Sequence, residues 1–166
     1  HSPTRSAPSS RLKESAETVR RLMQRPPGAI RKAASIIHKI RNCSRAVRWH
    51  ERLALPPHPG AAQAFDAAIE ALIHEFGAEE IWVFGSCARG QPTRHSDVDL
   101  MVVRSARPDC LRPSLEALKV IRPFHVFPMD LFVIGPDLWA ARRQKPQGVY
   151  LDIVHNGKRI YARQDR

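Results

Sequence analysis

The stretch from residue 82 to residue 103, WVFGSCARGQPTRHSDVDLMVV, constrains the fold most, because unusual residues gather there between two apolar runs. The first run, residues 81–84, stops at Gly85-Ser86, and the second, residues 100–103, follows Asp97 and Asp99. This pattern predicts a strand, a glycine turn, a short helix, a loop and a second strand.

Two carboxylates open the predicted second strand. Residues i and i+2 of a strand point to the same face, so Asp97 and Asp99 would lie side by side. Adjacent carboxylates repel each other unless they share a proton, pair with a base or bind a cation, and an oxygen-only cluster suits Mg²⁺. The pair therefore indicates a candidate metal site.

The turn before them has the composition of a phosphate-binding loop. Gly85 lets the backbone approach a ligand closely, and the Ser86 hydroxyl can donate to a phosphate oxygen. The opposing interpretation is structural, because Gly, Ser and Asp are common in turns for conformational reasons alone. Either half of the pattern alone would be weak evidence, whereas both halves with flanking strands favour a functional site.

The motif resembles that of the minimal nucleotidyltransferases of the DNA polymerase β superfamily. Their signature is Gly-Ser, a spacer and Asp-x-Asp, and here ten residues separate Gly85-Ser86 from Asp97-Val98-Asp99. The resemblance covers roughly residues 62–163. It implies an α/β (α+β) fold of the polymerase β-like kind, with a small mixed sheet flanked by helices.

The same resemblance implies the chemistry of the site. The family has a third carboxylate on a later strand, and Asp130 in MDLFVI is the matching residue. Asp97, Asp99 and Asp130 would hold two Mg²⁺ ions, with Asp130 also serving as the general base. Binding of the nucleotide, with ATP as the expected donor, would fall to four residues of the motif: Gly85, Ser86, Arg89 and Ser96.

Charge divides the chain into two parts. Residues 1–60 hold 13 Lys and Arg against 3 Asp and Glu, a net +10, whereas residues 61–166 hold 14 against 13, a net +1. Residues 1–10 are rich in Ser and Pro, and two amphipathic helices are expected at residues 11–24 and 29–55. We expect residues 1–60 to be a basic, partly disordered and partly helical extension, and residues 61–166 to be the nucleotidyltransferase domain.

The remaining elements are expected from periodicity and turn residues. Helices are predicted at residues 61–76, 108–122, 138–144 and 150–155, the second weakened by Pro113. Residues 125–134 are predicted as an extended run that Pro128 interrupts, and residues 159–161 as a final strand. Trp49 is interpreted as a packing anchor.

The acceptor is less constrained than the reaction. Small members of the family are often antitoxins that add AMP to a tyrosine of a HEPN-family toxin, so the resemblance implies this partner. One alternative is transfer to a small molecule such as an aminoglycoside. Another is a non-catalytic module that binds nucleotide or, through the basic segment, nucleic acid.

The expected location is the cytoplasm. No apolar run is long enough to cross a membrane, and residues 1–30 show no secretory signal. Cys43, Cys87 and Cys110 lie far apart without the spacing of a zinc site or a disulfide framework. That usage is typical of a reducing compartment.

Overall fold

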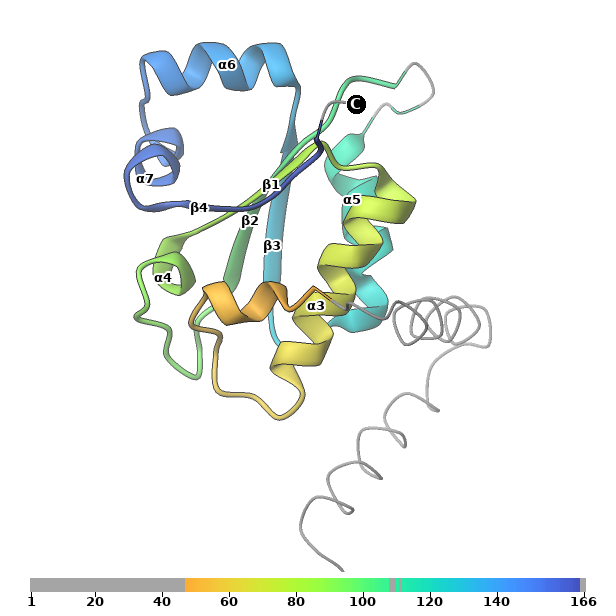
Figure 1. Ribbon diagram of the computed structural model, residues 1–166, viewed down its shortest axis with the longest axis vertical. Helices are drawn as coiled ribbons and strands as arrows, with labels where there is room; N and C mark the ends of the chain where they lie inside the picture. The colour runs from red at the N-terminus through yellow and green to blue at the C-terminus, as the bar shows by residue number, and fades with distance from the viewer. Residues whose placement is uncertain (1–46, 108–109, 111, 165–166) are drawn as a thin grey trace, which may run out of the picture.

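The computed structural model describes residues 47–107, 110 and 112–164, and in them a four-stranded mixed sheet is flanked by helices (Figure 1). The predicted fold class is therefore confirmed. The elements follow in this order: η1 (Trp49–Arg52), α3 (Ala61–Ala71), η2 (Leu72–Phe76), β1 (Glu80–Phe84), α4 (Gly85–Ala88), β2 (Val98–Val103), α5 (Pro113–Ile121), η3 (Arg122–Phe124), β3 (Met129–Ile134), α6 (Pro136–Gln144), α7 (Val149–Asn156) and β4 (Lys158–Ala162).

The strands are ordered β3-β2-β1-β4 across the sheet. Strand β1 pairs antiparallel with both β2 and β4, while β2 and β3 are parallel. Parallel neighbours require a crossover connection, and α5 supplies it. The crossover brings the start of β3 beside the start of β2.

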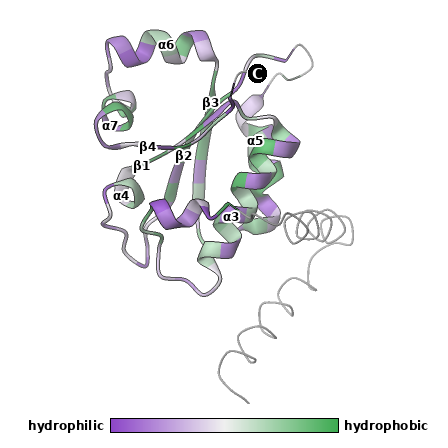
Figure 2. Cartoon of the chain, viewed as in Figure 1, coloured by the Kyte–Doolittle hydropathy of each residue, from purple (hydrophilic) through white to green (hydrophobic). Residues whose placement is uncertain are grey.

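Each face of the sheet is covered by its own helices (Figure 1). One side packs on α3 and α5 and contains the larger core, with Phe65, Ile69 and Ile81 fully buried. The other side packs on α6 and α7 around Trp139 and Ile153. Figure 2 shows the same division, with hydrophobic residues along the strands and on the helix faces turned towards them.

Burial alternates along β1. Ile81 and Val83 are buried, whereas Trp82, Phe84 and Glu80 are only partly buried. In β2 nearly every residue is buried except Asp99, as expected for a central strand covered on both faces. Asp99 is therefore a polar side chain in an otherwise apolar strand.

Two predicted boundaries are wrong. The helix predicted for residues 29–55 does not extend over its described part, where a single 3₁₀ turn, Trp49–Arg52, precedes irregular chain. The reason is tertiary, because Trp49 is buried and its Nε1–H donates to Glu70 Oε1 at 2.8 Å. The extended run predicted from residue 125 begins as a strand only at Met129.

A third predicted boundary is wrong as well, because the helix predicted at residues 108–122 begins only at Pro113. The proline stands at the first turn of α5, where it needs no backbone N–H, so it starts the helix instead of weakening it. Trp49 is the packing anchor that was predicted. The helix predicted at residues 11–24 and the first part of the one predicted at residues 29–55, up to residue 46, lie outside the described residues. Of the helices in the described part, none combines the length and the apolar character needed to cross a bilayer.

Candidate active site

The Gly85 turn and Asp99 are in direct contact. Gly85 follows β1 with a φ of 69°, in the left-handed region that favours glycine. A Cβ added to Gly85 would collide with Asp99 Oδ2, and Asp99 Cγ would lie 3.3 Å from it. The residue must therefore be glycine for the turn to lie against the carboxylate of the neighbouring strand.

Asp99 and Asp130 occupy matching positions on two parallel strands. Asp99 is paired with Asp130 in the register of β2 and β3, and Asp97 immediately precedes β2. Neighbouring strands lie about 4.8 Å apart, so the two paired carboxylates leave the sheet side by side. Pro128 does not disturb this pairing, because its carbonyl accepts the Val98 N–H at 3.0 Å.

Asp99 has a shifted pKa that reflects its burial and the charges around it. Its pKa is raised, first by burial and then by the negative charges of Asp130, Asp97 and Asp152, against an opposing effect of Arg89. A carboxylate in such surroundings gains from a cation or a proton. The site is thus short of positive charge.

A cavity of about 290 Å³ opens beside the carboxylates. Most of its walls are apolar, and two aromatic rings, Phe84 and Phe132, meet edge to face with centroids 6.0 Å apart. The lining residues are Phe84, Asp99, Leu100, Leu118, Asp130, Leu131, Phe132 and Val149. An acidic end and an apolar wall are the usual features of a small-ligand site.

The donor set suits a hard divalent cation. Asp97, Asp99 and Asp130 offer only carboxylate oxygens, which Mg²⁺ prefers, and no nitrogen or sulfur that would favour zinc. The chemistry of the donors therefore fits the metal. Among the residues that the structure describes, no three Asp, Glu, His or Cys side chains are gathered closely enough to hold one ion.

The other predicted binding residues lie around the turn. Ser86 is the second residue of α4, next to Gly85. Ser96 lies in the following loop, where its Oγ accepts the Thr93 N–H at 2.8 Å. Arg89 is at the end of α4, and its guanidinium forms an ion pair with Asp152. The roles of these residues towards a nucleotide stay predictions.

Cys87 is buried within the same turn. Burial raises the pKa of its thiol, and the Sγ–H donates to the Asp97 carbonyl at 3.5 Å. A buried thiol with a raised pKa is a poor nucleophile, so the side chain is a packing residue of the turn.

Asp152 is the residue of this region that the sequence reasoning missed. It lies on α7, yet it accepts the Gly85 N–H at 3.2 Å and an Arg89 Nη1–H at 2.9 Å. Asn156 donates to it as well, at 2.8 Å, and these donors lower the pKa of Asp152, with the Asn156 bond contributing most. No pattern in the sequence points to Asp152, because its contact with Gly85 spans 67 residues.

Comparison with known proteins agrees with this description. Residues 66–131 match the family model described as "Nucleotidyltransferase domain". The match includes the Gly85 turn, Asp97, Asp99 and Asp130, and ends before α6 and α7. No curated protein and no solved structure gives a significant match. Over residues 66–131 the chain is therefore similar to nucleotidyltransferase domains, which supports nucleotidyl transfer as its general activity.

Proposed function

We propose that this chain is a metal-dependent nucleotidyltransferase that transfers a nucleoside monophosphate from a triphosphate to a hydroxyl group. One observation carries the proposal: the glycine turn lies against Asp99, and Asp130 stands beside Asp99 in register. A phosphate held at the turn would thus lie next to two carboxylates suited to divalent cations. The match to nucleotidyltransferase domains supports the same activity.

The residues of the chain have separate roles in this reaction. Asp97, Asp99 and Asp130 would hold two Mg²⁺ ions, which when bound neutralise the triphosphate and lower the pKa of the acceptor hydroxyl. The Gly85-Ser86 turn would bind the β- and γ-phosphates through its hydroxyl and backbone N–H groups. The Asp130 carboxylate would accept the proton of the acceptor hydroxyl. As the acceptor oxygen bonds to the α-phosphorus, the bond to pyrophosphate breaks and pyrophosphate leaves.

We further propose that the donor is ATP and the acceptor a tyrosine of a partner protein of the HEPN toxin family. The cavity supports a phenol, because Phe84, Phe132 and Val149 give it an apolar wall next to the carboxylates. ATP and the identity of the partner follow from the resemblance to minimal nucleotidyltransferases. They are the parts of the proposal that the experiment must decide.

A surface beside the cavity supports a protein as the acceptor. Large exposed apolar side chains stand on α6 and α7: Leu138 is 50% exposed and Leu151 45%. We call the exposed apolar residues of these two helices, Leu138, Val149, Leu151 and Val154, the α6–α7 surface. Tyr150 and Arg142 connect its two helices, because the Arg142 guanidinium lies 5.4 Å from the centre of the Tyr150 ring.

This surface reaches the cavity directly. Val149 both lines the cavity and is 43% exposed, and Tyr150 packs edge to face on Phe132 of the cavity wall. Arg142, Arg143 and Lys145 add exposed positive charge at its border. An apolar surface with a basic border fits a protein partner that presents apolar and acidic side chains.

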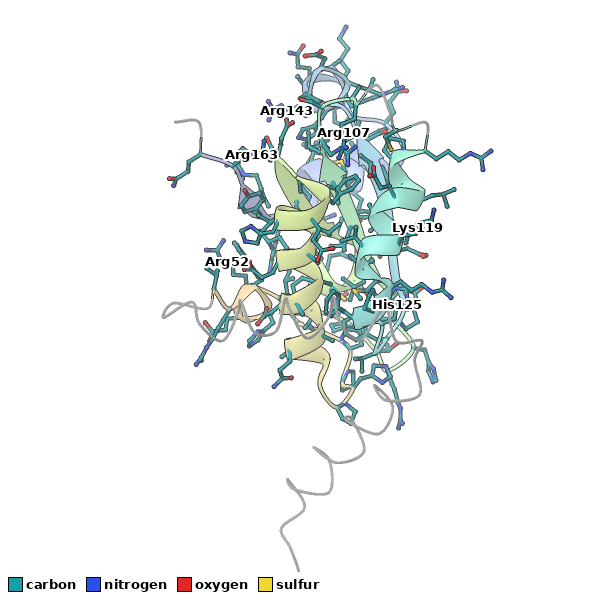
Figure 3. All side chains as sticks on the ribbon, turned by 90° about the vertical axis from the view of Figure 1, so that its right-hand side faces the viewer. Arg52, Arg107, Lys119, His125, Arg143 and Arg163 are labelled. Carbon is teal, nitrogen blue, oxygen red and sulfur yellow. The ribbon has the colours of Figure 1, made fainter. Side chains whose placement is uncertain are left out.

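Nucleic acid has less support as the partner of the described domain. In the view of the face that carries α3 and α5, the labelled Arg52 and Lys119 lie at opposite edges (Figure 3). A nucleic-acid groove requires a continuous basic stripe instead. The strongly basic residues 1–46 lie outside the described part, so binding through them stays a proposal.

The test is transfer of label from each of the four nucleoside triphosphates, labelled on the α-phosphorus, with Mg²⁺ and a lysate of the source cells. We expect one labelled protein with the wild type and with the control Asp137→Asn, and none with the Asp99→Asn/Asp130→Asn double variant. Mass spectrometry of the labelled protein should locate the nucleotide on a tyrosine. Absence of label on any protein, RNA or small molecule would refute the catalytic proposal and leave a binding module.

A further inference from the structure

Asp152 connects the last helix of the domain to both ends of the glycine turn. Its Oδ2 accepts the N–H of Gly85, the first residue of α4, at 3.2 Å. Both of its carboxylate oxygens accept from Arg89 Nη1, at 2.9 and 3.0 Å, and Arg89 follows the last residue of α4. One side chain of α7 therefore holds the start and the end of a helix of only four residues.

Helix α4 is also held by the core, because Cys87 and Ala88 are buried. A four-residue helix makes few internal hydrogen bonds, and no side chain caps it locally. Asp152 is itself fixed by Asn156, one turn further along α7, whose Nδ2–H donates to it at 2.8 Å. Ile153, which follows Asp152 in the sequence, is fully buried in the core between α7 and the sheet. The position of the Asp152 carboxylate is therefore fixed by the Asn156 hydrogen bond and by the burial of its neighbour Ile153.

The position of the turn matters because it touches Asp99. Gly85 leaves no room for a side chain between its backbone and Asp99 Oδ2, so a shift of the turn would change the space available to that carboxylate. The contacts run from Asp152 to Gly85 and from Gly85 to Asp99. None of them requires Asp152 to touch a substrate.

We propose that Asp152 is a positioning residue for nucleotidyl transfer, which holds the turn from Gly85 to Arg89 in the place that the Asp99 carboxylate requires. This inference rests on the proposed function and extends it to a part of the chain, α7, beyond the residues that match nucleotidyltransferase domains. It also changes the expected role of Arg89. The guanidinium holds the turn through Asp152, and phosphate contact falls to Ser86 and the backbone.

A different role for the same contacts makes the opposite prediction. If Asp152 occupied Arg89 in place of a phosphate, removing the carboxylate would free Arg89, and the KM for the triphosphate would fall. If Asp152 positions the turn, removing it lowers kcat and brings no gain in affinity. The split between KM and kcat therefore separates the two roles.

The experiment compares Asp152→Ala, Asp152→Asn and the control Asp137→Asn in the full chain. Asp137 is an exposed carboxylate of α6, so its variant removes the same charge from a neighbouring helix. We expect Asp152→Ala to lower kcat by about tenfold or more, as small misplacements of catalytic groups do. Asp152→Asn keeps an oxygen for the Gly85 N–H and should be less impaired, and Asp137→Asn should match the wild type.

A second readout does not depend on activity. Hydrogen exchange of the Gly85 amide should be roughly tenfold faster in Asp152→Ala, because the N–H loses a charged acceptor.

Arg89→Ala should lower kcat too, and its combination with Asp152→Ala should be no worse than the worse single variant, since both act through one ion pair. If Asp152→Ala does not fold, Asp152→Asn provides the same comparisons with a smaller expected change.

The outcomes separate this inference from the proposed function. A lower KM for the triphosphate, unchanged kcat, or additive effects of the two variants would overturn the positioning role while the wild type remains an active transferase. An inactive wild type would overturn both proposals. Hydrogen exchange of the Gly85 amide would then report only whether the Gly85–Asp152 hydrogen bond exists. Lower kcat, faster Gly85 exchange and non-additivity together support the positioning role.

Discussion

Replacing Gly85 with alanine tests whether the glycine turn serves the Asp99 carboxylate or only the backbone. Two effects are expected at this position. The left-handed φ of 69° strains any other residue, and the new Cβ would collide with Asp99 Oδ2. The first effect acts on stability and the second on the site, so the two can be measured separately.

The magnitudes follow from the geometry. An L-residue in the left-handed region costs roughly 1–2 kcal/mol of folding free energy. The collision involves the end of a side chain, so rotation of the carboxylate relieves it at small further cost in stability. That rotation displaces the Asp99 carboxylate, and a displacement of about 1 Å can lower a rate roughly 100-fold.

Gly90→Ala is the matched control. Gly90 follows the same short helix with a φ of 74°, but nothing lies within 4 Å of a Cβ at that position. Both variants should therefore lose about the same 1–2 kcal/mol, measured by thermal unfolding. Nucleotide transfer should fall roughly 100-fold in Gly85→Ala alone. Equal losses of transfer in the two variants, or full activity of Gly85→Ala, would refute the reasoning.

Three further predictions concern the carboxylate, the core and the α6–α7 surface. The folded-state pKa of Asp99 is raised, so its ionisation destabilises the fold above its ordinary pKa of 3.8. Asp99→Asn should raise the Tm at pH 7, and the gain should vanish as the pH falls below that value. Arg104 is buried and donates to Glu116 and to a backbone carbonyl of η2. Arg104→Ala should cost about 2 kcal/mol or more by chemical denaturation, and Glu116→Ala clearly less. Leu151→Glu/Val154→Glu should abolish labelling of the partner protein while triphosphate binding and Tm persist; unchanged labelling would remove the case for this surface.

The local parts of the site could be predicted because their residues are close in the sequence. A strand, a glycine turn and a second strand occur within residues 82–103, and the structure shows all three, with Asp97 just before β2 and Asp99 within it. Asp130 could be assigned to the site only through the family resemblance, because the crossover through α5 is what brings β3 beside β2.

Features that depend on distant contacts could not be predicted. Asp152 is 67 residues from Gly85, and nothing in the residues around it differs from an ordinary helix position. The end of the predicted helix at residues 29–55 was wrong for a similar reason. Trp49 bonds to Glu70, and the His50 N–H donates to Asp66 at 2.9 Å, so contacts with α3 prevail over the local periodicity.

The register between β2 and β3 decides whether Asp130 joins the site at all. A slip of one residue would turn its side chain to the face covered by α3 and α5. The pairing starts where the Pro128 carbonyl accepts the Val98 N–H, and this contact uses the backbone and not the proline ring.

Pro128→Ala should therefore keep the register. Its loss of stability should be about 0.5–1 kcal/mol, from the greater freedom of the unfolded chain. Nucleotide transfer at saturating triphosphate should stay within a few-fold of the wild type. A loss as large as that of Asp130→Asn would mean that the ring itself holds Asp130 beside Asp99, and the backbone explanation of the register would be wrong.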